Sequence, residues 1–368
     1  MIRPTLGRYM AMHFFRWTFY IYLLFFVLIF SIDLVELTRA ASKHEGITFG
    51  AVVSLSFLRV PEFAGRVLPF AVLFGAASSL LILNRRLELV VARASGVSVW
   101  QFLMPFVLMG TAIGLFSAMV YGPISLAAKR QSQTIEAESF GKVKGNLSNK
   151  TRNFWLRVGQ EGGDVVIRAR VGEDHGRKLT GVSAYLFGPK GEAEERIDAE
   201  TAIFVNGANG KNYYQMTEAT ITNPQTVGQK AEIVDLPVNI TESELLLNTS
   251  SPESVSFWSL PGQADRVRAA GRNYLPFLSR FQSQLSTPLL FVAMVLLAGC
   301  ISLRFARFGQ SGRVILGGII AGFMLYVASE LVITFGSNGF VPPAMAAWSP
   351  AFVATLIGIT VLLHQEDG

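Results

Sequence analysis

The chain has 368 residues, of which 51% are hydrophobic and 16% are charged, and its mean hydropathy is +0.40. These values, with the apolar residues gathered in long runs, exclude an ordinary soluble protein. The formal net charge is +6, but residues 125–275 hold eighteen basic and eighteen acidic side chains, so the whole excess lies in the apolar remainder. A nucleic-acid-binding protein carries its positive excess on a soluble domain, so that function is excluded too.

Three apolar runs in the first third of the chain predict membrane-spanning helices, because about 20 residues are needed to cross a bilayer. The runs cover residues 14–32, about 59–83 and about 99–121. No small-residue cleavage site follows the first run, so we expect an uncleaved helix with Asp33 in a solvated exit. Pro61 interrupts the second run, as membrane helices tolerate where neighbours satisfy the freed carbonyl.

Small residues recur at helical spacing in these runs. Ala71, Gly75 and Ser79 form a ridge in the second run, and Gly110 and Gly114 make a GxxxG pair in the third. Such residues let helix backbones approach closely, and we expect ordinary helix packing at the GxxxG pair.

Residues 84–98 separate the second and third runs and carry Arg85, Arg86, Glu88 and Arg93, so they do not cross the membrane. An apolar stripe at helical spacing and a terminal Gly96 predict an amphipathic helix of about four turns on the cytoplasmic side. The stripe consists of Leu87, Val90, Val91 and Ala94. Two interpretations remain open, namely a helix lying in the bilayer interface and a docking surface for a partner protein. Glu88 favours docking, since a carboxylate pairs with a partner's arginine.

A polar region follows the third run and predicts an inserted all-β domain, a sandwich or an open barrel. Six short runs rich in β-branched and aromatic residues are separated by glycine-rich turns; they cover residues 154–158, 164–171, 182–187, 199–205, 213–222 and 231–240. In the second of these runs Val165, Ile167 and Ala169 alternate with Val166, Arg168 and Arg170, which leaves one face solvated.

Three further spans are predicted at about 275–301, 314–335 and 341–363. With the N-terminus in the cytoplasm, nine arginines fall in short cytoplasmic segments, and the β domain and the uncharged loop GSNGFVPP fall outside. The positive-inside rule favours this orientation. The predicted fold is an α-helical membrane protein with six transmembrane helices and an inserted all-β, jellyroll-like periplasmic domain between the third and fourth helices.

No motif for bond chemistry was found in the sequence. GKVKGN and GQSGRV lack the Gly-Lys-Ser/Thr ending of a nucleotide loop, and there is no GxSxG elbow or kinase motif. The single cysteine, Cys300, and four scattered histidines offer no disulfide or metal-ligand spacing. Glu330 is the one acid deep in a late span, and a functional role and a hydrogen bond to Tyr326 remain open alternatives. We therefore expect no enzymatic activity, no metal and no cofactor in this chain.

Together these features resemble the LptF/LptG permease family of the lipopolysaccharide-export ABC transporter. The most specific part is VLPFAVLFGAASSLLILNRRLELVVARASGVS, residues 67–98, in which ELVVxxASG is closer to the LptG members than to the LptF members. The inserted β domain resembles the periplasmic β-jellyroll of the family, and NFWLRVG takes the place of its opening aromatic strand. One departure is that Asp33 to Glu36 stand where LptG members often carry lysines.

The resemblance implies one half of a transporter in the Gram-negative inner membrane, with both termini cytoplasmic. Its partners would be an LptF-like permease, two LptB-like ATPase subunits that bind ATP and Mg, an LptC-like single-span protein and a periplasmic LptA-like bridge. Lipopolysaccharide would be extracted and passed toward the outer membrane. The division implied is residues 1–128 with spans one to three and a coupling helix at 84–97, residues 129–262 as the β domain, and residues 263–368 with the remaining spans. ATPase coupling would involve Arg85, Arg86, Glu88, Val91 and Gly96.

Five cations fall at the outer ends of the first three spans, where the positive-inside rule does not require them. They are Arg39, Lys43, Arg66, Lys129 and Arg130. We expect them to contact lipid A phosphates through charge-assisted hydrogen bonds; the alternative is that several extend to the interface without a specific ligand. Two other functions also remain open, an ABC-type mechanotransmission protein and a membrane receptor with a periplasmic β sensor domain.

Overall fold

The protein was analysed as a computed structural model, which describes residues 4–42, 48–144, 151–160, 163–173, 176–188, 192–207, 212–223, 228–238, 240, 245, 252–269, 273–308 and 311–367. The chain forms two compact units. One is helical and comprises Met1–Thr134 with Pro252–Gly368; the other is Ile135–Ser251 and contains the strands. The strand-bearing unit is narrower than the expected 129–262; it begins within α5 (Gly122–Lys144), and the residues from Pro252 on belong to the helical unit.

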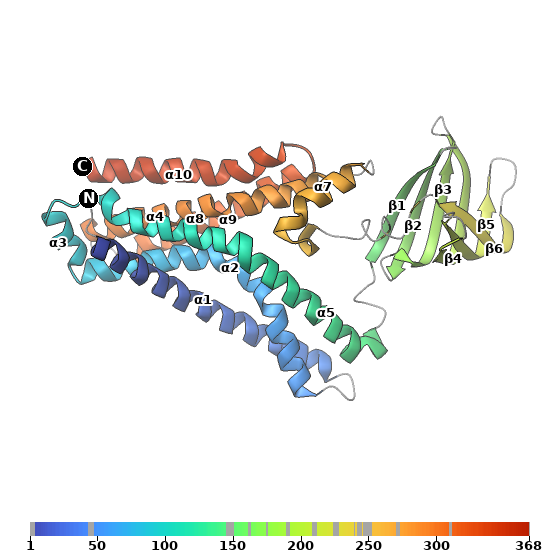
Figure 1. Cartoon of the computed structure of the whole chain (residues 1–368), viewed down its shortest axis with the longest axis horizontal. Coiled ribbons are helices and arrows are strands. Elements are labelled where there is room, and N and C mark those ends of the chain that lie inside the picture. The colour runs from blue at the N-terminus through green and yellow to red at the C-terminus, as the bar shows by residue number, and fades with distance from the viewer. Residues whose placement is uncertain are drawn as a thin grey trace. The chain divides into compact units, whose positions relative to one another are not determined.

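Among the residues that the structure describes, six helical segments are long and apolar enough to cross a membrane, as predicted. They are Thr5–Ala41, Phe49–Arg85, Val99–Glu136, Leu275–Ser302, Leu316–Ser337 and Pro343–Gln365. The helices that contain them are α1 (Pro4–Ala41), α2 (Phe49–Arg85), α4 (Val99–Phe116) with its continuations η1 (Ser117–Tyr121) and α5 (Gly122–Lys144), α8 (Leu275–Phe308), α9 (Ser311–Ser337) and α10 (Pro343–Asp367). Figure 1 shows these long helices, with α3 (Glu88–Ala94) near the start of α1, where Tyr9 hydrogen-bonds Glu88.

The first two helices are longer than their apolar runs predicted. Hydropathy marks only the part of a helix that faces lipid, and polar residues can continue the helix where they find partners inside the protein. Asp33, expected in a solvated exit, is only 7% exposed and lies 3.8 Å from the Nε of Arg59 on α2. This ion pair joins the extensions of α1 and α2 beyond the apolar runs.

Both small-residue motifs lie where helices pack closely. Ala71, Gly75 and Ser79 are all buried on α2, and a methyl group on Gly75 would lie 2.6 Å from the Cα of Thr18 on α1. A methyl group on Gly114 would lie 2.5 Å from the Cα of Pro288 on α8. The expected packing role is therefore confirmed.

The strand-bearing unit contains one antiparallel sheet of six strands in chain order. The strands are β1 (Thr151–Gln160), β2 (Gly163–Glu173), β3 (Lys178–Phe187), β4 (Ala193–Val205), β5 (Asn212–Thr222) and β6 (Gln229–Val238), and each overlaps one predicted run (Figure 1). Buried Val165, Ile167 and Ala169 alternate with more exposed neighbours on β2, as predicted.

The inserted all-β domain is confirmed. A sandwich or an open barrel was expected; the described strands show no sandwich or jellyroll connectivity, whereas a single sheet of consecutive strands does not contradict the open barrel. Each strand pairs with the next one along the chain, from Phe154 opposite Ala169 to Tyr214 opposite Leu236. Short connections favour pairing between consecutive strands, and the result is a meander rather than a crossing between two sheets. One face of the sheet forms the core, with Tyr214 fully buried and its hydroxyl donating to the carbonyl oxygen of Gly176 at 2.7 Å.

Candidate functional site

The short helix α3 is one of two candidate sites. The chain leaves α2 at Arg85, turns through Leu87 in a left-handed conformation with φ of 64°, and forms only the seven residues of α3. It then turns at Gly96, where φ is 87°, before Ser98 caps α4 by accepting a hydrogen bond from the backbone N–H of Gln101. The predicted helix of four turns is therefore wrong in length, because the turn at Leu87 interrupts it.

The apolar side chains of α3 point in two directions. Leu89 is 5% exposed and packs in the core of the helical unit. Val91 is 66% exposed, and Leu87 and Val90 are also exposed. The predicted stripe thus faces away from the rest of the chain, and Leu89, which was not part of it, anchors the helix.

Charged groups surround this exposed stripe. The side chains of Arg85, Arg86 and Arg93 are exposed, whereas Glu88 is half-buried and accepts a hydrogen bond of 3.4 Å from the hydroxyl of Tyr9 on α1. Exposed apolar groups ringed by guanidinium groups suit either a membrane surface or a protein partner. All five predicted coupling residues lie in or beside this one segment.

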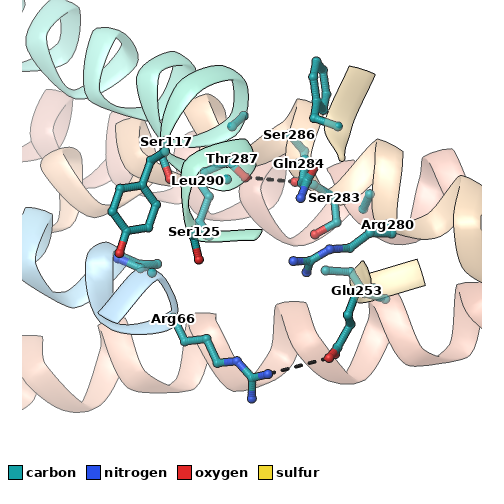
Figure 2. A pocket seen from close by; sticks show the side chains of 18 of the residues that line it. Arg66, Ser117, Ser125, Glu253, Arg280, Ser283, Gln284, Ser286, Thr287 and Leu290 are labelled. Carbon is teal, nitrogen blue, oxygen red and sulfur yellow. Dashed lines mark hydrogen bonds and ion pairs between the residues drawn. The ribbon is translucent and has the colours of Figure 1, made fainter. Parts of the chain in front are cut away.

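The second candidate site is a cavity of about 360 Å³ inside the helical unit. It is bordered by α2, η1, α5, α8, α9 and α10 and by the segment 252–259, which contains η4 (Pro252–Ser254) and η5 (Phe257–Ser259). Figure 2 shows Arg66, Glu253, Arg280 and Ser283 around the same opening. Its volume is within the range of small-molecule sites.

Glu62 lies at the centre of an ion-pair network on one side of the cavity. Its Oε1 accepts a hydrogen bond from the Nζ of Lys129 at 2.7 Å and lies 3.7 Å from the Nη2 of Arg66. Arg66 also lies 3.8 Å from Oε2 of Glu253 (Figure 2). Two of the cations expected to bind lipid phosphates are therefore already paired with carboxylates.

The segment 252–259 is held against the helices by two further hydrogen bonds. Arg130 donates to the carbonyl oxygen of Ser254 at 2.9 Å, and the indole N–H of Trp258 donates to the carbonyl oxygen of Met119 at 3.2 Å. Met119 belongs to the π-helical turn η1, and such turns are frequent at functional sites. Arg66 and Arg130 thus share one role in this structure, since both tie this segment to the helices.

Two hydrogen bonds through the hydroxyl of Tyr121 join three helices beside the cavity. The hydroxyl of Tyr121 donates to the carbonyl oxygen of Pro61 at 2.6 Å and accepts from the hydroxyl of Tyr22 at 2.8 Å. Tyr121 thus links a backbone carbonyl of α2 to a side chain of α1.

The five predicted lipid-binding cations do not form one cluster. Arg66, Lys129 and Arg130 gather around the segment 252–259, Arg39 is exposed and does not line the cavity, and Lys43 lies outside the described residues. Sequence reasoning missed Glu62 and Arg280. The i,i+4 spacing of Glu62 and Arg66 was an available signal for the first, whereas nothing local marks Arg280.

Residues 8–364 match the family described as lipopolysaccharide export system permease LptF/LptG. The chain is also 25% identical over 323 residues to the lipopolysaccharide export system permease protein LptG of Escherichia coli strain K12, covering 84% of this chain and 85% of that protein. The protein of the same name from E. coli O6:H1 strain CFT073 gives the same identity and coverage. The family match extends over nearly the whole chain, and the chain therefore belongs to the LptF/LptG family of lipopolysaccharide export system permeases.

Proposed function

We propose that this chain is the LptG-like permease subunit that extracts lipopolysaccharide from the Gram-negative inner membrane and passes it to a periplasmic bridge. The family match over residues 8–364 carries the proposal. The arginine distribution supports an orientation with α3 and both termini in the cytoplasm and the β unit in the periplasm. The remaining half of the transporter would be an LptF-like permease, accompanied by an LptC-like single-span protein and a periplasmic LptA-like bridge.

The energy for extraction comes from partner ATPase subunits in this proposal. ATP and Mg would be bound by two LptB-like subunits, and α3 would transmit their movement to the spans. The exposed stripe around Val91 supplies an apolar contact, and the guanidinium groups of Arg85 and Arg86 surround it. Glu88 would pair with a basic residue of the ATPase, and Gly96 would allow the turn back into α4.

Lipid A phosphates would interact with the cations beside the cavity and at the extended end of α1. Arg66 and Lys129 are paired with carboxylates, so a phosphate must compete with Glu62 or Glu253 for them. Arg39 is exposed, and in the described part of the chain no carboxylate forms an ion pair with its side chain. We therefore propose that Arg39 contacts phosphate first and that Arg66, Lys129, Arg130 and Lys43 complete the contacts.

A matched pair of variants tests the docking surface. Val91→Arg places a charge in the exposed stripe of α3, and Phe340→Arg places one on a side chain that is 78% exposed between α9 and α10, at the opposite end of the helical unit. In the purified complex we expect Val91→Arg to lose the ATPase and Phe340→Arg to retain it. Retention of the ATPase by both variants would refute docking at α3 and favour a bilayer-interface helix.

Transport itself is tested with proteoliposomes that contain the complete complex and lipopolysaccharide. ATP should drive release of lipopolysaccharide to an added periplasmic acceptor protein. ATP turnover that never moves lipopolysaccharide would instead support a mechanotransmission protein.

A further inference from the structure

We propose that the cavity beside α8 and α9 is a binding site for the phosphoethanolamine headgroup of a bilayer phospholipid. This inference goes beyond the proposed function, because it concerns a lipid that stays in the membrane rather than the exported cargo. It rests on the charges that line the cavity, on an unsatisfied amide oxygen and on the depth of the site.

The charged side chains around the cavity divide into a closed set, whose members are joined by ion pairs, and an open set, whose members form no ion pair with a described residue. Six charged side chains line it, three basic and three acidic: Glu62, Arg66, Lys129, Glu253, Arg280 and Glu330. The first four are joined in the network around Glu62. Arg280 and Glu330 form no ion pair with any residue that the structure describes, and none with each other, although both line the cavity.

A ligand with one charge does not match this open set. An inorganic phosphate near Arg280 would meet the carboxylate of Glu330 in the same small cavity, and a metal cation near Glu330 would meet the guanidinium of Arg280. Both side chains are exposed, but like charges brought together within one cavity repel each other. A zwitterion satisfies both, with its phosphate at Arg280 and its ammonium at Glu330.

The uncharged polar lining favours a primary ammonium. The Oε1 atom of Gln284 is buried and has no hydrogen-bond partner in the described chain, and Gln284 lines the cavity. A primary ammonium has three N–H donors, which Glu330 and the Gln284 oxygen can accept. A trimethylammonium group has none, so the cavity should distinguish ethanolamine from choline.

The position along the helices also fits a headgroup. Arg280 lies five residues after the first residue of α8, and Glu330 lies seven residues before the last residue of α9. At 1.5 Å per residue, both charges are within about 10 Å of these helix ends, near the boundary of the hydrocarbon core. Leu290, Ile333 and Ala351 also line the cavity and offer apolar contacts to the glycerol and the first acyl carbons.

The test measures lipid retained by the purified transporter complex after reconstitution in nanodiscs that contain equal amounts of phosphatidylethanolamine, phosphatidylcholine and phosphatidylglycerol. Native mass spectrometry after release from the nanodisc should show phosphatidylethanolamine bound to the wild-type chain. We expect Arg280→Gln and Glu330→Gln each to reduce its retention at least tenfold. Arg280→Lys and Glu330→Asp keep the charges and should retain it, which separates loss of a contact from misfolding. Lys230→Gln removes an exposed cation on β6 that does not line the cavity and should change nothing.

Three outcomes would overturn the proposal. Equal retention of phosphatidylcholine would show that no ammonium donor is recognised, and preferential retention of phosphatidylglycerol would indicate an anion site. Unchanged phosphatidylethanolamine in both neutralised variants would place the lipid elsewhere. None of these readouts depends on lipopolysaccharide, so failure here leaves the export function open to its own test.

Discussion

Replacing Gly75 by alanine tests whether the backbones of α1 and α2 are in direct contact. The added methyl group would lie 2.6 Å from the Cα and 2.8 Å from the N of Thr18. Carbon atoms pack without strain at about 3.5 Å or more, so the two helices must separate by on the order of 1 Å. The hydrogen bond of 2.7 Å between His13 and Ser79 lies on the same seam, one turn along α2, and separation would weaken it.

The magnitude follows from two opposed effects. Overpacking costs about 3 kcal/mol where backbone atoms must move, and alanine recovers about 1 kcal/mol of helix propensity, so Gly75→Ala should lose about 2 kcal/mol of stability. Gly50 on the same helix is the control, since nothing lies within 4 Å of a methyl group there. Gly50→Ala should be neutral or gain up to about 1 kcal/mol.

The assay is thermal unfolding of the purified protein in detergent at one fixed scan rate, because membrane proteins often unfold irreversibly. A difference of about 2–3 kcal/mol between the two variants corresponds to about 4–12 °C in apparent midpoint for a unit of this size. Equal midpoints for Gly75→Ala and Gly50→Ala would refute the close approach of α1 and α2.

Three other predictions follow from particular contacts. Tyr121→Phe removes the donor to the Pro61 carbonyl and strands the hydroxyl of Tyr22; it should cost about 1–3 kcal/mol in thermal unfolding, and Tyr22→Phe should cost less because the Pro61 bond survives. In the β unit, a hydrogen bond from Glu218 to Glu200 raises the pKa of Glu218 above its ordinary value of 4.5. Protonated Glu218 therefore stabilises the β unit fully below pH 4.5, and this stabilisation is lost as the pH rises through the raised pKa. Glu218→Gln should unfold at a higher temperature than wild type at pH 8, and its unfolding temperature should no longer change with the titration of this residue. Arg66→Gln combined with Arg130→Gln should reduce lipopolysaccharide-stimulated ATP hydrolysis and leave basal hydrolysis intact; if Glu253→Gln causes the same loss, the arginines act by holding the segment 252–259 and not by contacting lipid.

The helices and strands were predictable because local patterns determine them. The alternation of Val165, Ile167 and Ala169 with Val166 and two arginines specified β2 and its buried face, and the structure confirms both. Apolar runs likewise specified the number of spans. Their ends were not predictable, since the extension of α1 past Asp33 depends on Arg59, which lies on another helix. The meander of the sheet also depends on pairing between strands, which no single run encodes.

The spacing of apolar residues identified the stripe of α3 but not whether the stripe faces the rest of the chain or the surroundings. A repeat of apolar residues says that a surface is apolar and not whether this chain or another covers it. The structure shows that one side chain, Leu89, anchors the helix, while Val91 and its neighbours remain exposed. The stripe predicted from the sequence is thus exposed in the structure, and its contact with a partner stays a prediction.

The cations illustrate a limit of reading charge along a sequence. Counting basic residues at the ends of spans treated each one as free to bind a phosphate. Arg66 instead pairs with Glu62 on its own helix and with Glu253, which follows the whole β unit in the chain. Lys129 is likewise held by Glu62 from another helix. A cation bound in this way binds an added anion less readily than an unpaired one, because the anion must first replace a carboxylate. Of the two groups left unpaired at the cavity, Arg280 was identified only by its lack of an ion pair in the described structure, whereas Glu330 was already marked in the sequence as an acid within a late span. Their opposite signs are the reason to expect a zwitterion there, while the paired cations around Glu62 hold the surrounding helices in place.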